Sequence, residues 1–143
     1  MTGYNKVFLD TTPLINFLDS DVHFGNKTKN ILEEILSFEK TIVSSVITCS
    51  EYLVYPYRTD NQEKIDVFFE FTDACGIDLL SISVDIAKAA ARIRADYPCF
   101  KARDSLQLAV AIDAGCDVFL TNDKQLRQFR ELRCVTVEEW ELT

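Results

Sequence analysis

Short apolar runs alternate with longer segments of helical periodicity along almost the whole chain, and this alternation limits the fold more than any other feature. The apolar runs lie at residues 7–9, 41–44, 77–82, 117–120 and 134–137. The first, Val7-Phe8-Leu9, is continuous, as in a strand that is buried on both faces. Strand–helix alternation is typical of a parallel sheet covered by helices. We therefore expect an α/β fold, a three-layer α/β/α sandwich whose central, mostly parallel sheet has about five strands.

The helical segments are separated by capping residues and helix breakers. They cover residues 12–18, 27–39, 45–55, 60–75, 84–95, 105–114 and 124–129. Pro13 suits the first turn of its helix, and we expect Pro56 to stop the helix that precedes it. The segment 105–114 is apolar on almost all sides, with only Gln107 and Asp113 as interruptions. This pattern predicts a helix that is packed on several faces.

The length of 143 residues suits one domain, residues 1–143, which can fold without a metal or disulfide staple. We see no signal peptide and no membrane span. The cysteines are odd in number, widely spaced and without a CxxC pair, at Cys49, Cys75, Cys99, Cys116 and Cys134. This pattern argues against a disulfide framework and a zinc site. It favours small buried hydrophobic residues in a reducing compartment, so we expect a cytoplasmic protein.

Four acidic residues are placed by the predicted fold near one edge of the sheet. Asp10 directly follows the first strand, and Asp123 lies three residues after the fourth. The carboxyl ends of parallel strands meet at the same edge, where such folds bind ligands. Asp104 begins the buried helix that leads into the fourth strand, and Glu51 lies about two turns into the helix after the second.

Each of these acids also has a purely structural interpretation. Asp10, Asp104 and Asp123 all precede predicted helices and suit the N-cap position. Glu51 lies among apolar neighbours, where a carboxylate is normally paired or ligating, so a salt bridge to an arginine is its alternative. Together, however, several carboxylates at one edge repel each other unless a cation lies between them.

Carboxylate oxygens without histidine or cysteine suit Mg²⁺ or Mn²⁺. The only histidine, His23, lies in a polar stretch, where we expect it to be exposed rather than ligating. One or two such ions can bind a phosphodiester, lower the pKa of a bound water and stabilise the leaving oxygen. The acids therefore indicate metal-dependent phosphodiester chemistry.

Four separated segments resemble the PIN-domain family in order and spacing. They are Leu9-Asp10-Thr11-Thr12-Pro13-Leu14-Ile15, Ser50-Glu51-Tyr52-Leu53, Arg103-Asp104-Ser105-Leu106-Gln107-Leu108-Ala109 and Thr121-Asn122-Asp123. The resemblance runs from residue 7 to about residue 137, nearly the whole chain. The size is similar to that of the VapC-type toxins of toxin–antitoxin pairs.

This resemblance implies a Rossmann-like fold, Mg²⁺-dependent endoribonuclease activity on RNA, frequent homodimers and, for a toxin, a small antitoxin protein. Asp10 and Asp104 would be direct metal ligands, and Asp123 would complete the metal site, often through water. Glu51 would orient a water or bind a second ion. Thr121 resembles the family's hydroxyl residue beside the last acid, and Thr11 is a candidate partner of Asp10, although either threonine suits a turn equally well.

A formal net charge of −8 is unusual for a protein that binds RNA. The four acids account for half of this excess, and eight of the fifteen basic residues fall between positions 92 and 133. Lys101, Arg103 and Lys124 are the best candidates for phosphate contact, and ordinary solvated helix faces are the alternative. An aromatic group suits the core, a dimer face or an antitoxin groove: Tyr52, Tyr55, Tyr57, Phe68, Phe69 and Phe71.

Two other classes of function fit the sequence less well: a phosphoryl-transfer domain and a non-catalytic PIN-like module. A haloacid-dehalogenase-like phosphatase would carry a second aspartate two residues after Asp10, where this chain has Thr12. A receiver domain would carry its phosphorylated aspartate after a later strand. A catalytically idle PIN-like module that binds RNA or protein would usually lack one or more of the four acids, and all four are present here.

Overall fold

The computed structural model describes all residues from Met1 to Thr143. Its centre is one five-stranded, entirely parallel sheet in the order β3-β2-β1-β4-β5. The strands are β1 (Lys6–Leu9), β2 (Thr41–Ser45), β3 (Asp78–Leu80), β4 (Val118–Thr121) and β5 (Arg133–Thr136). The predicted number and direction of the strands are confirmed.

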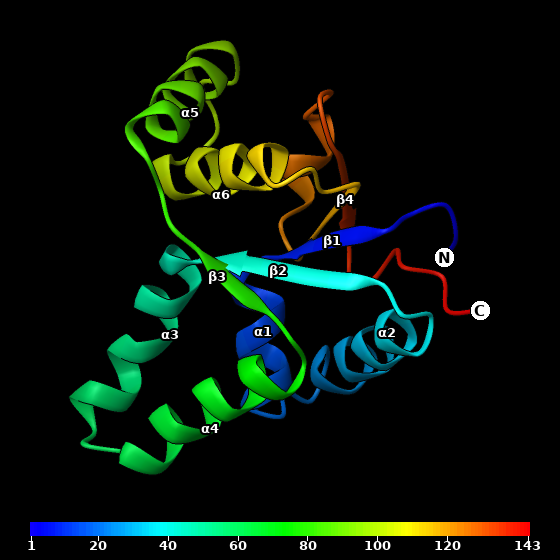
Figure 1. The fold of residues 1–143 in the computed structure, drawn as a ribbon, viewed down its shortest axis with the longest axis vertical. Helices are drawn as coiled ribbons and strands as arrows, with labels where there is room; N and C mark the ends of the chain where they lie inside the picture. Colours follow the sequence, from blue (N-terminus) through cyan, green and yellow to red (C-terminus); the bar gives the residue numbers. More distant parts are fainter.

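Six α-helices and one short 3-10 helix connect the strands (Figure 1). They are α1 (Thr11–Leu18), α2 (Gly25–Ser37), α3 (Val46–Arg58), α4 (Gln62–Ala74), α5 (Val84–Asp96), α6 (Ala102–Asp113) and the 3-10 helix η1 (Lys124–Gln128). Helices α1 to α4 lie on one side of the sheet, and α5 and α6 lie on the other (Figure 1). The three-layer arrangement predicted from the sequence is therefore present. None of these helices combines the length and apolar character that a membrane crossing requires.

The sheet separates two hydrophobic cores because neighbouring residues of a strand point to opposite faces. Val7 and Leu9 of β1 pack in the core under α1 to α4. Phe8, between them, packs in the core under α5 and α6 and stacks on Phe119 with ring centroids 5.0 Å apart. All three β1 side chains are fully buried, which explains the continuous apolar run at residues 7–9.

The chain order makes β1 the centre of the sheet. The chain proceeds from β1 to β2 and β3 on one side, and then crosses to β4 and β5 on the other. Leu9 at the end of β1 pairs with Leu120 of β4. The carboxyl ends of β1 and β4 therefore meet at the topological switch point, the usual position of a ligand site in an open parallel sheet.

Some sequence predictions about individual elements are wrong. Pro56 does not stop its helix: α3 continues to Arg58, because a proline one turn from a helix end removes only one backbone hydrogen bond. Asp104 does not begin α6 but is its third residue. The cysteines are all free, but only Cys116 is buried and Cys99 is exposed, so the prediction of uniform burial fails.

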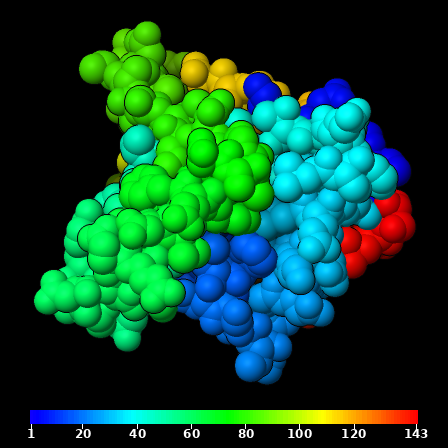
Figure 2. Space-filling view, turned by 60° about the horizontal axis from the view of Figure 1, so that its bottom comes forward, coloured from blue at the N-terminus to red at the C-terminus, as the bar shows by residue number.

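The aromatic group on α3 and α4 divides between core and surface. Tyr52 and Phe68 are buried and stack with ring centroids 4.9 Å apart. Tyr55, Tyr57 and Phe69 are 61%, 63% and 44% exposed. In the space-filling view of Figure 2, the α3–α4 hairpin forms a lobe beside the blue surface of α1 and α2. The core interpretation therefore holds for only part of the group.

Candidate functional site

Asp10 lies at the topological switch point, between the end of β1 and the start of α1. Its backbone N–H donates to the Leu120 carbonyl oxygen at 3.0 Å, which fixes its position beside β4. One carboxylate oxygen accepts from the Thr11 backbone N–H at 2.8 Å, so Asp10 does cap α1. The other oxygen accepts from the Thr121 hydroxyl at 2.8 Å. An N-cap needs only the first bond, and the second connects Asp10 to β4.

The carboxyl group of Asp10 is difficult to ionise. Burial, with a smaller contribution from the negative charge of Asp104, raises the pKa of Asp10 to about 6 against the opposing effects of Thr121, Thr11 and Arg103. A buried charge without full compensation is unstable. Near neutral pH this site therefore favours a cation.

Asp104 faces the same edge from the other layer of helices. It is only 7% exposed, and its carboxylate accepts one long hydrogen bond, 3.4 Å, from the Lys101 backbone N–H. Burial raises the pKa of Asp104 as well; Arg103 opposes this increase, and the negative charge of Asp123 adds to it. The three carboxylates therefore form a series: the charge of Asp104 raises the pKa of Asp10, and the charge of Asp123 raises the pKa of Asp104.

Glu51 forms the ion pair that was the alternative to a ligand role. One of its oxygens lies 2.7 Å from Nη1 of Arg103, and the other accepts from the Thr11 hydroxyl at 2.8 Å. Nε of Arg103 also lies 3.8 Å from a carboxylate oxygen of Asp104. The pKa of Arg103 is raised, first by the hydrogen bond to Glu51 and then by the surrounding carboxylates. The guanidinium is about half exposed, so this pair is not a closed, buried one.

Asp123 occupies the rim beyond β4. Its carboxylate accepts from the Gln125 backbone N–H at 2.9 Å, so it caps η1 as the alternative interpretation proposed. Its own backbone N–H donates to the Thr121 hydroxyl oxygen at 3.1 Å. Thr121 thus contacts both Asp10 and Asp123, as Thr11 contacts both Asp10 and Glu51.

Hydrogen bonds and ion pairs join all four acids into one connected group. The path runs through Asp123, Thr121, Asp10, Thr11, Glu51, Arg103 and Asp104. The fold therefore gathers residues that are far apart in the sequence. The assignment of catalytic and ligand roles to these residues stays a prediction.

The fit of a divalent cation to these residues is mixed. The donors are carboxylate oxygens, which suit Mg²⁺ or Mn²⁺, and their mutual repulsion would be relieved by such an ion. However, no three acidic, histidine or cysteine side chains converge closely enough to hold a metal ion. Asp10 and Asp104 are the two candidate direct ligands, with Asp123 at the edge of the pair.

The three predicted phosphate contacts differ in their availability. Lys101 is exposed and forms no ion pair. Arg103 is shared between Glu51 and Asp104. Lys124 lies 3.5 Å from Glu138, in a pair whose side chains are both 65% exposed. Exposed pairs of this kind contribute little free energy, so a phosphate can compete for Lys124.

Sequence reasoning missed two polar residues next to the acids. Both polar atoms of the Asn122 side chain are buried without a hydrogen-bond partner, which costs about 1–3 kcal/mol per group and makes Asn122 a candidate ligand contact. Gln107, treated only as an interruption of an apolar helix, is 1% exposed and hydrogen-bonded beneath the site. The sequence did indicate that Gln107 was unusual, because it is a polar residue at a position predicted to be in the core.

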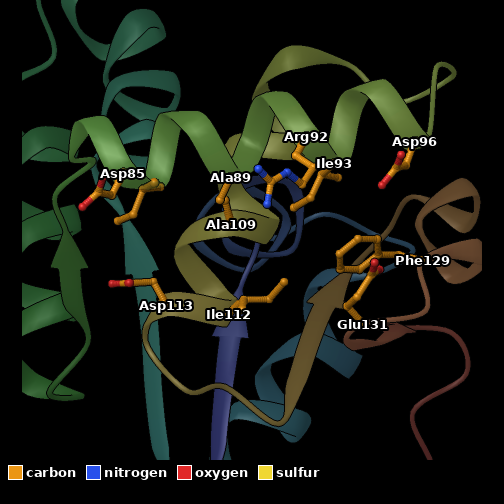
Figure 3. A pocket seen from close by; sticks show the side chains of 11 residues that line it. Asp85, Ala89, Arg92, Ile93, Asp96, Ala109, Ile112, Asp113, Phe129 and Glu131 are labelled. Atoms are coloured by element: carbon orange, nitrogen blue, oxygen red, sulfur yellow. The ribbon is translucent and has the colours of Figure 1, made fainter.

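A separate pocket of about 290 Å³ lies between α5 and α6, with Phe129 and Glu131 at one end (Figure 3). It is lined by apolar side chains such as Ile93 and Ile112, and by several acids at its rim. None of the four predicted site acids lines it. The pocket is therefore distinct from the carboxylate group, and nothing in the structure shows what would fill it.

Comparisons with known proteins agree with this architecture. A profile of the PIN domain matches residues 7–132. A comparison with curated proteins by sequence gave no match.

Solved structures share the fold at low sequence identity. VapBC2 from Rickettsia felis, bound to a DNA fragment from its promoter, has a TM-score of 0.73 and 18% identity, over 92% of this chain and 98% of that one. A toxin–antitoxin complex from Klebsiella pneumoniae has a TM-score of 0.71 and 21% identity, over 94% of this chain and 99% of that one. VapC20 of Mycobacterium tuberculosis is described as a toxin that cleaves the sarcin–ricin loop. It has a TM-score of 0.65 and 14% sequence identity, over 89% of this chain and 98% of that one. With the parallel sheet, the acids at its switch point and the profile match over residues 7–132, the chain belongs to the PIN-domain family.

Proposed function

We propose that this protein is a Mg²⁺-dependent endoribonuclease, the toxin of a toxin–antitoxin pair that acts in the cytoplasm. The observation that carries the proposal is the pair of carboxylates of half-buried Asp10 and buried Asp104, both with a raised pKa, at the switch point of a PIN fold. A structural cap needs no such destabilised pair. A site that binds a cation and a phosphodiester does need it.

Asp10 and Asp104 would hold the ion directly, and Asp123 would complete the site, often through water. The bound ion would supply Lewis-acid activation of a water and charge stabilisation at the phosphodiester. Thr121 donates to one oxygen of Asp10 and so holds its carboxylate toward β4.

Glu51 would orient the attacking water from the side of α3, because Thr11 and Arg103 fix its two oxygens. Lys101, Arg103 and Lys124 would contact substrate phosphates. With a net charge of −8, most of the surface repels RNA. Binding would therefore depend on these few cations and on the shape of the RNA, and a structured RNA, of the kind that VapC20 is described as cleaving, suits this better than a random strand.

The test is cleavage of RNA by the purified protein with Mg²⁺ and with EDTA. Asp10→Asn and Asp104→Asn should abolish metal-dependent cutting. Asp113→Asn is the matched control, because Asp113 is an exposed acid at the opposite end of α6. Absence of cutting on mixed and structured RNA alike would favour an idle binding module, and hydrolysis of a small phosphoester would favour a phosphatase.

The partners follow from the same proposal. The structural relatives include toxin–antitoxin complexes, so we propose a small antitoxin that covers the acidic site. We also propose a homodimer. A short neighbouring reading frame whose product binds this protein and stops cleavage would support the antitoxin, and sedimentation of the purified chain would give the oligomeric state.

A further inference from the structure

Five polar side chains are buried next to Glu51, and only Thr11 among them has a part in the proposed reaction. They come from α1, β2, α3 and α6, and none is more than 3% exposed: Thr11, Ser44, Ser45, Thr48 and Gln107. Buried polar groups are costly unless every donor and acceptor is paired. The protons of this group can therefore be assigned one by one.

The hydroxyl protons of Ser44 and Thr48 have only one consistent arrangement. The Ser44 hydroxyl oxygen lies 2.7 Å from the Leu9 carbonyl oxygen and 2.8 Å from the Thr48 hydroxyl oxygen. A carbonyl can only accept, so the single proton of Ser44 points to Leu9. The Thr48 hydroxyl must therefore donate its proton to the Ser44 hydroxyl oxygen.

The hydroxyl proton of Thr11 is also committed. Its oxygen lies 2.8 Å from the carboxylate of Glu51, which can only accept while it is ionised. The oxygens of Thr11 and Thr48 are 3.1 Å apart. Since both hydroxyl protons point elsewhere, these two oxygens would repel each other without a donor shared between them.

The side-chain amide of Gln107 supplies that donor. Its nitrogen lies 2.8 Å from the Thr48 oxygen and 3.4 Å from the Thr11 oxygen, so its two protons can serve one oxygen each. Its carbonyl accepts from the Ser45 hydroxyl, whose oxygen in turn accepts from the Ile47 backbone N–H at 3.1 Å. A flipped amide would place its carbonyl against two oxygens that have no proton to give. The orientation of Gln107 is therefore determined by its surroundings.

We propose that Gln107 is a positioning residue for Glu51, acting through Thr11 and Thr48. The inference rests on the proposed nuclease function, which it deepens. Gln107 keeps the Thr11 hydroxyl turned toward Glu51. Without the amide, the Thr11 proton turns to Thr48, and Glu51 keeps only its ion pair with Arg103, whose side chain is about half exposed.

Gln107→Met tests this proposal, since methionine keeps the volume and removes both amide protons. Thr48→Val removes the oxygen that accepts the shorter hydrogen bond of the Gln107 amide, so the amide is no longer held in the orientation that keeps the Thr11 hydroxyl on Glu51, and Thr48→Ser restores that oxygen. The matched control is Thr28→Val, because Thr28 is another fully buried helical threonine, with its hydroxyl bonded to the Phe24 carbonyl far from the site. Fluorescence of Trp140, the only tryptophan, reports whether each variant is folded.

We expect Gln107→Met and Thr48→Val to lower kcat for RNA cleavage by about tenfold or more, with KM changed less than about twofold. Thr48→Ser and Thr28→Val should stay near the wild-type kcat. A folded Gln107→Met variant with wild-type kcat would overturn the proposal. If Gln107→Met does not fold, the two Thr48 variants replace it in the test. A folded Thr48→Val variant with the same kcat as Thr48→Ser would then overturn the proposal.

A second measurement does not depend on catalysis. The NMR signals of the Gln107 side-chain amide, identified by their loss in Gln107→Met, should exchange slowly with solvent. They should shift in Glu51→Gln and stay in place in Glu131→Gln. If wild-type protein cleaves no RNA, the proposed function fails, while this shift still tests the connection from Gln107 to Glu51. Unchanged Gln107 signals in Glu51→Gln would show that no such connection exists.

Discussion

The stability of the protein should depend strongly on one buried carboxylate outside the acidic site, that of Glu34 in α2. Its oxygens accept from the Trp140 indole N–H at 2.9 Å and from the Thr143 backbone N–H and hydroxyl at 2.6 and 2.7 Å. The N-terminal amine of Met1 lies 3.3 Å away. Burial alone would raise the pKa of Glu34, but these donors outweigh it and lower the pKa from 4.5 to about 2.

The size of the effect follows from this pKa. The fall from 4.5 to about 2, at about 1.4 kcal/mol for each pKa unit, corresponds to about 3.5 kcal/mol of stability at pH 7. Glu34→Gln keeps the shape of the side chain and removes the charge, so it should lose about this amount. The folded pKa is the lower one, so the contribution of the charge is fully present above pH 4.5 and disappears as the pH falls toward 2.

Urea unfolding followed by Trp140 fluorescence measures this difference directly, because Trp140 is the only tryptophan and contacts Glu34. Between pH 7 and about pH 3, the gap between wild type and Glu34→Gln should shrink to less than half. Glu33→Gln is the control, because Glu33 is an exposed neighbour in a surface pair with Lys29. A Glu34→Gln variant as stable as this control, or a gap that does not change with pH, would refute the reasoning.

Four further predictions concern the site and the core. Burial raises the pKa of Asp10 to about 6, so its charge destabilises the folded protein at pH 7. In EDTA, Asp10→Asn should therefore be more stable than wild type at pH 7 by up to about 3 kcal/mol. This difference in stability should disappear as the pH falls from about 6 toward 3.8. Mg²⁺ should raise the Tm of wild type but not of Asp10→Asn, and it should lose this effect below about pH 6; an equal rise in both proteins would exclude Asp10 as a ligand. Arg103→Gln should raise KM for RNA about tenfold, from the loss of a charge-assisted phosphate contact, whereas Arg94→Gln should leave KM unchanged. Phe119→Ala, which empties a fully buried position stacked on Phe8, should cost about 3–5 kcal/mol in urea unfolding, and a loss below about 1 kcal/mol would contradict the described packing.

Local patterns were sufficient for most of the architecture. The continuous apolar run at Val7-Phe8-Leu9 predicted a strand covered on both faces, and the structure buries all three residues, in two separate cores. Alternation along the chain predicted the parallel sheet with helices on both sides. The error at Pro56 shows the limit of such patterns, because a proline signal does not say how many further residues the surrounding packing can keep helical.

The sequence by itself determined which acids stand at the ends of strands, since strand order and direction bring Asp10 and Asp123 to one edge whatever the side chains do. Only the tertiary structure decided how these acids are held. Arg103 lies between Glu51 and Asp104, and Gln107 is directed at Thr11 and Thr48 across a sequence separation of up to 96 residues. Periodicity records how a residue faces along its own element. Hydrogen bonds and ion pairs between elements depend on how whole elements pack against each other, which no local pattern contains.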